Sequence, residues 1–249
     1  MIRIVIILFF GTLFLFSCDG GKNREEGIQN QLIISTNGDT LENGFWSYEM
    51  NASGVSQRGN YLDGFKIGKW TYKTDMDSLS IIWNIYDKNS VKFNIPDRLR
   101  LIDNMESPIL FQADIVDNDD NTYLVLLRYN LKELNSSIYG YMYQYSHSWE
   151  KNDNELLITK EFKKFSFKGV EIFRANVETE IKTKYQATSN IFVINDFLYD
   201  LTYKQAATNN NAIEQEVFND ILYSMECDSI DLFNHFNRKY LKEEDVKIK

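Results

Sequence analysis

Apolar and polar residues are distributed differently in each part of the chain. The run from Ile4 to Phe16 is apolar at all but two positions. As a helix, this run would reach about two-thirds of the ~30 Å hydrocarbon core of a bilayer. One cation, Arg3, precedes the run, and Ser17 and Cys18 follow it. This layout predicts a secretory signal peptide over residues 1–17 rather than a membrane-spanning helix. Residues 18–30 are almost free of apolar side chains and predict a flexible tether.

Short alternating segments, typical of β-strands, follow from residue 31 to residue 95. GFWSYE (44–49) and GKWTYK (68–73) share one pattern, in which Trp46 and Trp70 hold the same place. Asp63-Gly64 predicts a tight turn between them. In residues 79–87, alternation puts three apolar side chains on one face: Ile81, Trp83 and Ile85. We therefore expect a small β-hairpin unit over residues 31–95.

The pattern changes after the polar connection 96–108, which lies between the two prolines of the chain and predicts a domain boundary. Strand-like segments then cover 109–116, 121–129, 155–162, 169–181, 182–188, 191–195 and 196–204. Helical spacing of apolar residues predicts a helix from Asn135 to Trp149, although the aromatic residues at odd positions there also fit a strand. A last helix is predicted from Ile213 to Met225, with Asn211 and Glu214 placed as in a capping box.

Leu15-Phe16-Ser17-Cys18 resembles the lipobox of bacterial lipoproteins, with Phe16 bulkier than the usual residue at its position. The resemblance implies that the chain is cleaved after Ser17 and that Cys18 is the lipid attachment site, carrying fatty acids of the palmitate type. Two or three acyl chains would hold the protein on a membrane. The alternative is an ordinary cleaved signal peptide that happens to end near a cysteine.

The repeated pattern around GNYLDGFKIGKW (59–70) resembles degenerate MORN-type repeats of bacterial proteins, which are often described as antitoxin-like. The resemblance covers about thirty residues. It implies β-hairpin packing in which each aromatic side chain covers a glycine of its neighbour, and it implies no chemistry.

The order of segments after residue 95 and the ending ILYSM (221–225) resemble PsbP/Mog1-like proteins. The resemblance implies an α/β/α sandwich with a mostly antiparallel sheet over residues 96–249. The expected fold class is therefore α+β, with the small β-hairpin repeat unit followed by this sandwich. Such proteins share no catalytic residues, so no site residue is carried over.

Charge and the scarcity of reactive residues exclude several classes of function. The net charge is −9, and it becomes −10 when Arg3 leaves with the signal peptide, which disfavours nucleic acid as a partner. Cys227 is expected to be a buried apolar residue, and the two histidines, His147 and His235, have no metal-ligand spacing. Asp117 begins a calcium-loop-like stretch that lacks the required glycine and glutamate. We therefore expect no metal, no cofactor and no enzyme activity.

One stretch, YGYMYQYSHSW (139–149), combines apolar rings with polar tips, as recognition surfaces do. It gives a candidate binding surface with five members: Tyr139, Tyr141, Tyr143, Tyr145 and Trp149. The alternative is that about half of these rings pack in the core.

Three functional hypotheses follow. The first is a lipid-anchored, non-catalytic protein of the bacterial cell envelope, held by Cys18 on the periplasmic or surface face of the outer membrane, which binds an envelope protein partner or acts as a scaffold. The second is a carrier or sensor for a small or apolar ligand. The third is an enzyme with an unrecognised acidic site.

Overall fold

The computed structural model describes ten stretches of the chain, and every structural statement below refers to them. They are residues 31–34, 40–50, 53–102, 106–115, 123–150, 156–167, 170–180, 184–207, 212–231 and 244–246. The predicted signal peptide and tether, Cys18, Asp117 and His235 lie outside these residues.

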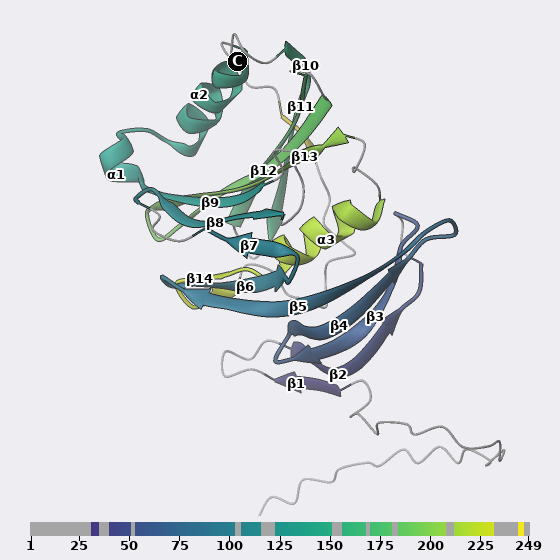
Figure 1. Ribbon diagram of the computed structural model, residues 1–249. Coiled ribbons are helices and arrows are strands. Elements are labelled where there is room, and N and C mark those ends of the chain that lie inside the picture. The colour runs from purple at the N-terminus through teal and green to yellow at the C-terminus, as the bar shows by residue number, and fades with distance from the viewer. Residues whose placement is uncertain are drawn as a thin grey trace, which may run out of the picture.

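The first sheet is antiparallel and contains the predicted repeat unit (Figure 1). Its strands lie in the order β1-β2-β3-β4-β5-β6-β14-β15. Their bounds are β1 Gln31–Ile34, β2 Thr40–Tyr48, β3 Ser56–Leu62, β4 Phe65–Lys73, β5 Ser78–Lys88, β6 Val91–Pro96, β14 Glu226–Cys227 and β15 Ile230–Asp231. Because β14 pairs with β6, the chain returns to its first sheet after most strands of the second sheet have formed.

The second sheet is also antiparallel, in the order β16-β10-β11-β12-β13-β9-β8-β7. Its strands are β7 Leu99–Leu101, β8 Ile109–Ile115, β9 Tyr123–Asn130, β10 Leu156–Phe167, β11 Val170–Glu180, β12 Lys184–Ile194, β13 Phe197–Ala206 and β16 Glu244–Asp245. The segments predicted at 182–188 and 191–195 are one continuous strand, β12, because Ser189 and Asn190 between them keep the pairing with both neighbours.

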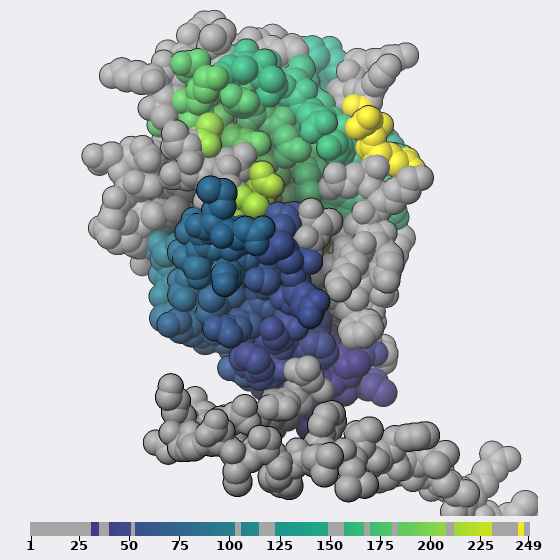
Figure 2. Space-filling view, turned by 90° about the vertical axis from the view of Figure 1, so that its right-hand side faces the viewer, coloured from purple at the N-terminus to yellow at the C-terminus, as the bar shows by residue number. Residues whose placement is uncertain are grey.

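Three helices are described: α1 Leu131–Leu134, α2 Ile138–Glu150 and α3 Ala212–Tyr223. Figure 1 shows α3 between the two sheets and α2 on the far side of the second sheet. In the space-filling view of Figure 2, atoms of α3 reach the surface between the blue first sheet and the green second sheet. None of the described helices is long and apolar enough to cross a membrane.

The larger hydrophobic core joins both sheets to α3. At one end the sheets touch directly, where the Phe111 ring of β8 lies 4.8 Å from the Tyr86 ring and 5.0 Å from the Phe93 ring, both in the first sheet. A second core lies between α2 and the opposite face of the second sheet, around Met142 and Phe173. The chain passes between the sheets after Pro96, where the boundary was predicted, yet the two parts share one core.

The predicted α/β/α sandwich is wrong. Of the described residues, 66% lie in strands and 17% in helices, and there are two sheets. The reason is that α3 has apolar contacts on two sides: its buried residues pack against the second sheet and also against the first. Residues 31–95 therefore form a layer of the same body. Helix α3, which was expected to cover the second sheet with its other side in solvent, is covered on that side by the first sheet.

The helix predicted at residues 135–149 is confirmed, and its strand alternative is excluded, because residues 138–150 form α2. The Ser137 hydroxyl caps it by accepting a hydrogen bond from the Gly140 amide at 3.2 Å. In β5 the predicted apolar face is only partly correct. Ile81 and Trp83 are buried, but Ile85 is 37% exposed and Tyr86 takes its place in the core, directed at the second sheet.

The aromatic–glycine packing expected in the repeat unit is confirmed for one pair. Asp63 and Gly64, both with positive φ, form the predicted turn between β3 and β4. Across this hairpin, the Trp70 ring lies against Gly59 so closely that a Cβ added at Gly59 would be 2.4 Å from it. Trp70 is fully buried, and its indole donates to the Asn60 carbonyl at 3.0 Å. The ring therefore has no room to move away.

We expect Gly59→Ala to lower the free energy of unfolding by about 1–3 kcal/mol, since the added methyl overpacks the contact with Trp70. Chemical denaturation measures this loss. Gly140→Ala in α2 is the matched control. Its Cβ would meet only the hydroxyl of Ser136, which can rotate, and alanine is the better helix former, so this variant should gain up to ~1 kcal/mol. Equal effects of the two substitutions would contradict the packing argument.

Candidate functional site

Helix α2 divides the predicted aromatic surface into two faces. Tyr141 and Tyr145, one turn apart, point at the second sheet. The Tyr141 hydroxyl donates to the Asp200 carboxylate of β13 at 2.8 Å, and the Tyr145 hydroxyl lies 2.6 Å from the Ser189 hydroxyl of β12. Both rings belong to the core beneath the helix. These two tyrosines therefore fix α2 on the sheet.

Tyr139 and Tyr143 lie on the exposed side of α2. Their side chains are 56% and 45% exposed, and one edge of Tyr139 rests on the Phe173 ring, 5.2 Å away. The His147 ring lies 4.1 Å from the Tyr143 ring, and its Nδ1 is 3.0 Å from the Tyr143 carbonyl. The side chain of Trp149 lies outside the described part. The five predicted residues thus do not form one surface, because a helix turns neighbouring odd positions to different sides.

Asp200 is the centre of the buried contacts beneath α2. Its carboxylate accepts hydrogen bonds from Tyr141 and from the Thr202 hydroxyl, both at 2.8 Å, and Thr202 continues the chain to Ser189. Burial raises the pKa of Asp200 from 3.8 to about 6, although the two hydrogen bonds oppose this shift. Burial and the neighbouring Asp200 charge also raise the pKa of Tyr141.

A buried ion pair joins α3 to the first sheet. Lys66 of β4 and Asp220 of α3, each 1% exposed, are in direct contact. The Tyr72 hydroxyl accepts hydrogen bonds from the Lys66 ammonium and from the Trp83 indole, both at 3.0 Å, and donates to Asp220 at 2.8 Å. The ammonium lies 4.1 Å from the centre of the Trp70 ring. We call these five residues the lysine cage.

The lysine cage is a structural site, because its members are all buried. The Lys66 ammonium also contacts the buried Gln57 side chain, whose amide donates to Glu216 of α3 at 3.0 Å. Burial and the charge of Asp220 raise the pKa of Tyr72 well above its usual value. Sequence reasoning found the aromatic repeats but missed the ion pair, since Lys66 and Asp220 are 154 residues apart. A lysine between aromatic residues of a strand (FKIGKW, 65–70) was the one local sign of it.

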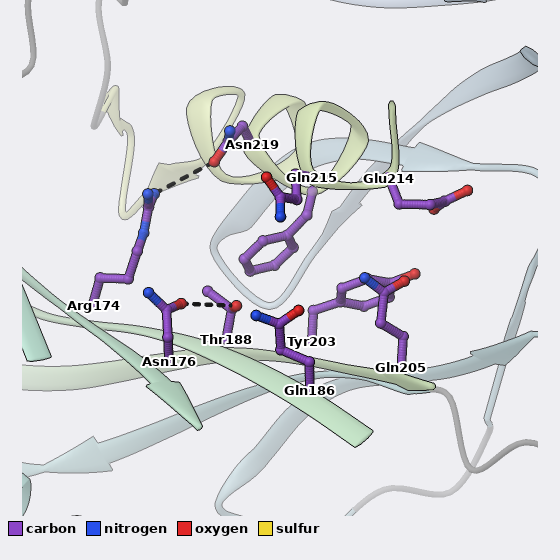
Figure 3. Close-up of a pocket in the computed structure, with 10 residues that line it drawn as sticks. Arg174, Asn176, Gln186, Thr188, Tyr203, Gln205, Glu214, Gln215 and Asn219 are labelled. Carbon is purple, nitrogen blue, oxygen red and sulfur yellow. Dashed lines mark hydrogen bonds between the residues drawn. The ribbon is translucent and has the colours of Figure 1, made fainter. Parts of the chain in front are cut away.

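A small polar pocket of about 160 Å³ lies between α3 and the inner face of the second sheet (Figure 3). Side chains of β11, β12 and β13 form its floor, and Gln215 of α3 points down into it. Phe218 of the same helix also lines the pocket. Glu214, at its rim, forms a two-pronged ion pair with Arg98, with one of the contacts at 2.7 Å. This pocket was not predicted, because its amides come from three strands and a helix.

The other residues considered in the sequence have structural surroundings. Cys227 is a free, fully buried cysteine, as predicted. Burial and, to a lesser extent, the charge of Asp228 raise the pKa of its thiol. Asp114, three residues before the calcium-loop-like stretch, forms an ion pair with Arg100 at 2.8 Å, which lowers the pKa of the Asp114 carboxyl. Within the described stretches, no group of three or more potential metal ligands is gathered at one point.

No protein-family model matches the sequence, and no curated protein matches it either. Sixteen chains of solved structures match the fold. One is the solution structure of the cyanobacterial PsbP protein CyanoP from Synechocystis sp. PCC 6803, with 12% sequence identity and a TM-score of 0.43, covering 58% of this chain and 92% of CyanoP. The PsbP part of the predicted resemblance is thus matched in part. At this level of similarity we draw no argument from it.

Proposed function

We propose that this chain is a lipid-anchored, non-catalytic protein of the bacterial cell envelope that binds a protein partner. The observation that carries the proposal is the exposed face of α2. Tyr139 and Tyr143 are large rings on the surface, and the helix that bears them is fixed from below by Tyr141 and Tyr145. Rings held in place lose little freedom when a partner binds, which favours a recognition surface.

The partner surface is tested by placing a photo-crosslinking amino acid at Tyr139 in cells that make the full chain. We expect one discrete protein adduct, and we expect Tyr143→Ala to remove it without changing the thermal stability of the protein. Met76, which is 97% exposed in the connection between β4 and β5, is the control position. If Met76 gives the same adduct, or if the adduct persists in Tyr143→Ala, the α2 surface is not the binding site.

The anchor rests on the sequence around Cys18. We expect a fatty-acid analogue fed to the cells to label the wild-type chain and to fail to label Cys18→Ala, because the thiol is the attachment point. Gel fluorescence after coupling a dye to the analogue measures the label. Since Cys227 is fully buried, Cys227→Ala is the matched control and should keep the full label. Labelling that persists in Cys18→Ala would show that the anchor is wrongly assigned.

The second hypothesis, a carrier or sensor, receives support only in a restricted form. The pocket beside α3 is smaller than the ~300 Å³ at which pockets for drug-sized ligands begin, and its lining is mostly polar. A large apolar ligand does not fit such a pocket.

A further inference from the structure

The register of the second sheet builds the floor of the pocket. Asn176 of β11 pairs with Thr188 of β12, and Thr188 pairs with Tyr203 of β13. In the next row, Gln186 of β12 pairs with Gln205 of β13. Paired residues point to the same face of a sheet, so these side chains all face α3, as Figure 3 shows. They stand on paired strands and are therefore held in place before any ligand arrives.

The polar groups of the pocket are mainly amides and hydroxyls. A side-chain amide offers both donors and acceptors, and a hydroxyl does the same. The charged members already have partners: Glu214 pairs with Arg98, and the Arg174 guanidinium donates to Asn190 at 3.0 Å and, within the pocket lining, to Asn219 at 3.4 Å. Arg174 also lies over the Phe165 ring, 5.1 Å away. The pocket is therefore suited to a neutral ligand that both donates and accepts hydrogen bonds.

The pocket also has one apolar wall. The rings of Tyr203 and Phe218 are stacked, with their centres 5.3 Å apart and an angle of 18° between their planes, and both residues line the cavity. Polar groups on the strands thus stand beside an apolar surface at the helix. A ligand that fits has hydroxyl groups around its edge and a C–H face. The pocket volume of about 160 Å³ limits the ligand to roughly one ring.

From this geometry we infer that the pocket binds a single residue of a neutral carbohydrate. A pyranose ring carries hydroxyls that donate and accept around its edge, which matches the amides of Gln186, Gln205 and Gln215. Its C–H face matches the wall formed by Tyr203 and Phe218. The inference does not depend on the lipid anchor or on the α2 surface.

The test uses the full chain, labelled with ¹⁵N, in a zwitterionic detergent that carries no sugar headgroup. Glucose, galactose and N-acetylglucosamine are titrated separately while the side-chain amide signals of Asn and Gln are followed by NMR. We expect at least one sugar to shift the signal of Gln186, which is identified by its loss in Gln186→Leu. The same variant should weaken sugar binding at least about tenfold, because the hydrogen bonds that it removes together contribute about a factor of ten to the affinity. The shifts of the remaining pocket amides measure this binding.

Two further variants and two further ligands make the outcome decisive. Thr188→Val keeps the shape of the floor and should also weaken binding, whereas Gln144→Leu on the exposed side of α2 should not. Inorganic phosphate and a blocked trialanine peptide are titrated in the same way. The inference is overturned if no sugar shifts the pocket amides, if phosphate or the peptide shifts them and the sugars do not, or if Gln186→Leu binds sugar as the wild type does.

Discussion

Replacing Lys66 by methionine is expected to lower the free energy of unfolding by about 3–5 kcal/mol, because it leaves the Asp220 carboxylate buried without its cation. Methionine fills similar space, so the loss reports the charge and not a cavity. Asp220 is 1% exposed, and the Tyr72 hydroxyl, which donates to it at 2.8 Å, does not replace the lost positive charge. Urea denaturation of the wild type and the variant, followed by tryptophan fluorescence, measures the difference.

The double variant Lys66→Met/Asp220→Leu separates the charge from the packing. Replacing both members of a buried pair by apolar residues is often close to neutral, so the double variant should recover most of the loss. The matched surface pair is Lys132–Asp196, at 3.1 Å, whose side chains are 79% and 69% exposed. Lys132→Met should cost less than about 1 kcal/mol. A loss of that small size in Lys66→Met would mean that the cage does not hold α3 to the first sheet.

Asp200→Asn is expected to stabilise the protein above pH 6 and to flatten the dependence of its stability on pH. The pKa of the carboxyl is about 6 in the fold against 3.8 ordinarily, so between these values the folded protein binds more protons than the unfolded chain. Stability from this group is therefore full below about pH 4 and falls as the pH rises to 6. The complete shift corresponds to about 3 kcal/mol, and part of the hydrogen bonding to Tyr141 and Thr202 is kept by the amide.

Denaturation at several pH values from 4 to 7.5 tests this expectation. The difference in stability between Asp200→Asn and the wild type should grow through this range and level off above pH 6. Asp196→Asn, which changes a largely exposed carboxyl in the neighbouring turn, is the control variant and is measured at the same pH values. A parallel slope in Asp200→Asn and the wild type would show that Asp200 does not titrate between 4 and 6.

The two buried sites give the exposed surfaces their rigidity. The lysine cage joins α3 to the first sheet, and α3 is one wall of the polar pocket. The Asp200 contacts hold α2, which carries Tyr139 and Tyr143.

The sequence predicted local structure well because alternation and helical spacing report which side of a segment is buried. Most of the strands, the turn at Asp63-Gly64 and both long helices follow from such local signs. The failure in β5 has the same origin. Alternation placed Ile85 inside, but the second sheet lies against Tyr86, and the pattern of one strand contains no information about a distant layer.

Only the tertiary structure decided what covers each buried face. The apolar positions of a helix such as α3 do not show whether one sheet or two pack against it. The predicted sandwich therefore lacked the layer formed by the first sheet. The Lys66–Asp220 pair and the return of β14 to β6 likewise depend on contacts between residues far apart in the chain. The sequence by itself determined most of the segments, and it predicts the anchor at Cys18. Long-range packing determined the layers, the cage, the pocket and which tyrosines of α2 face the solvent.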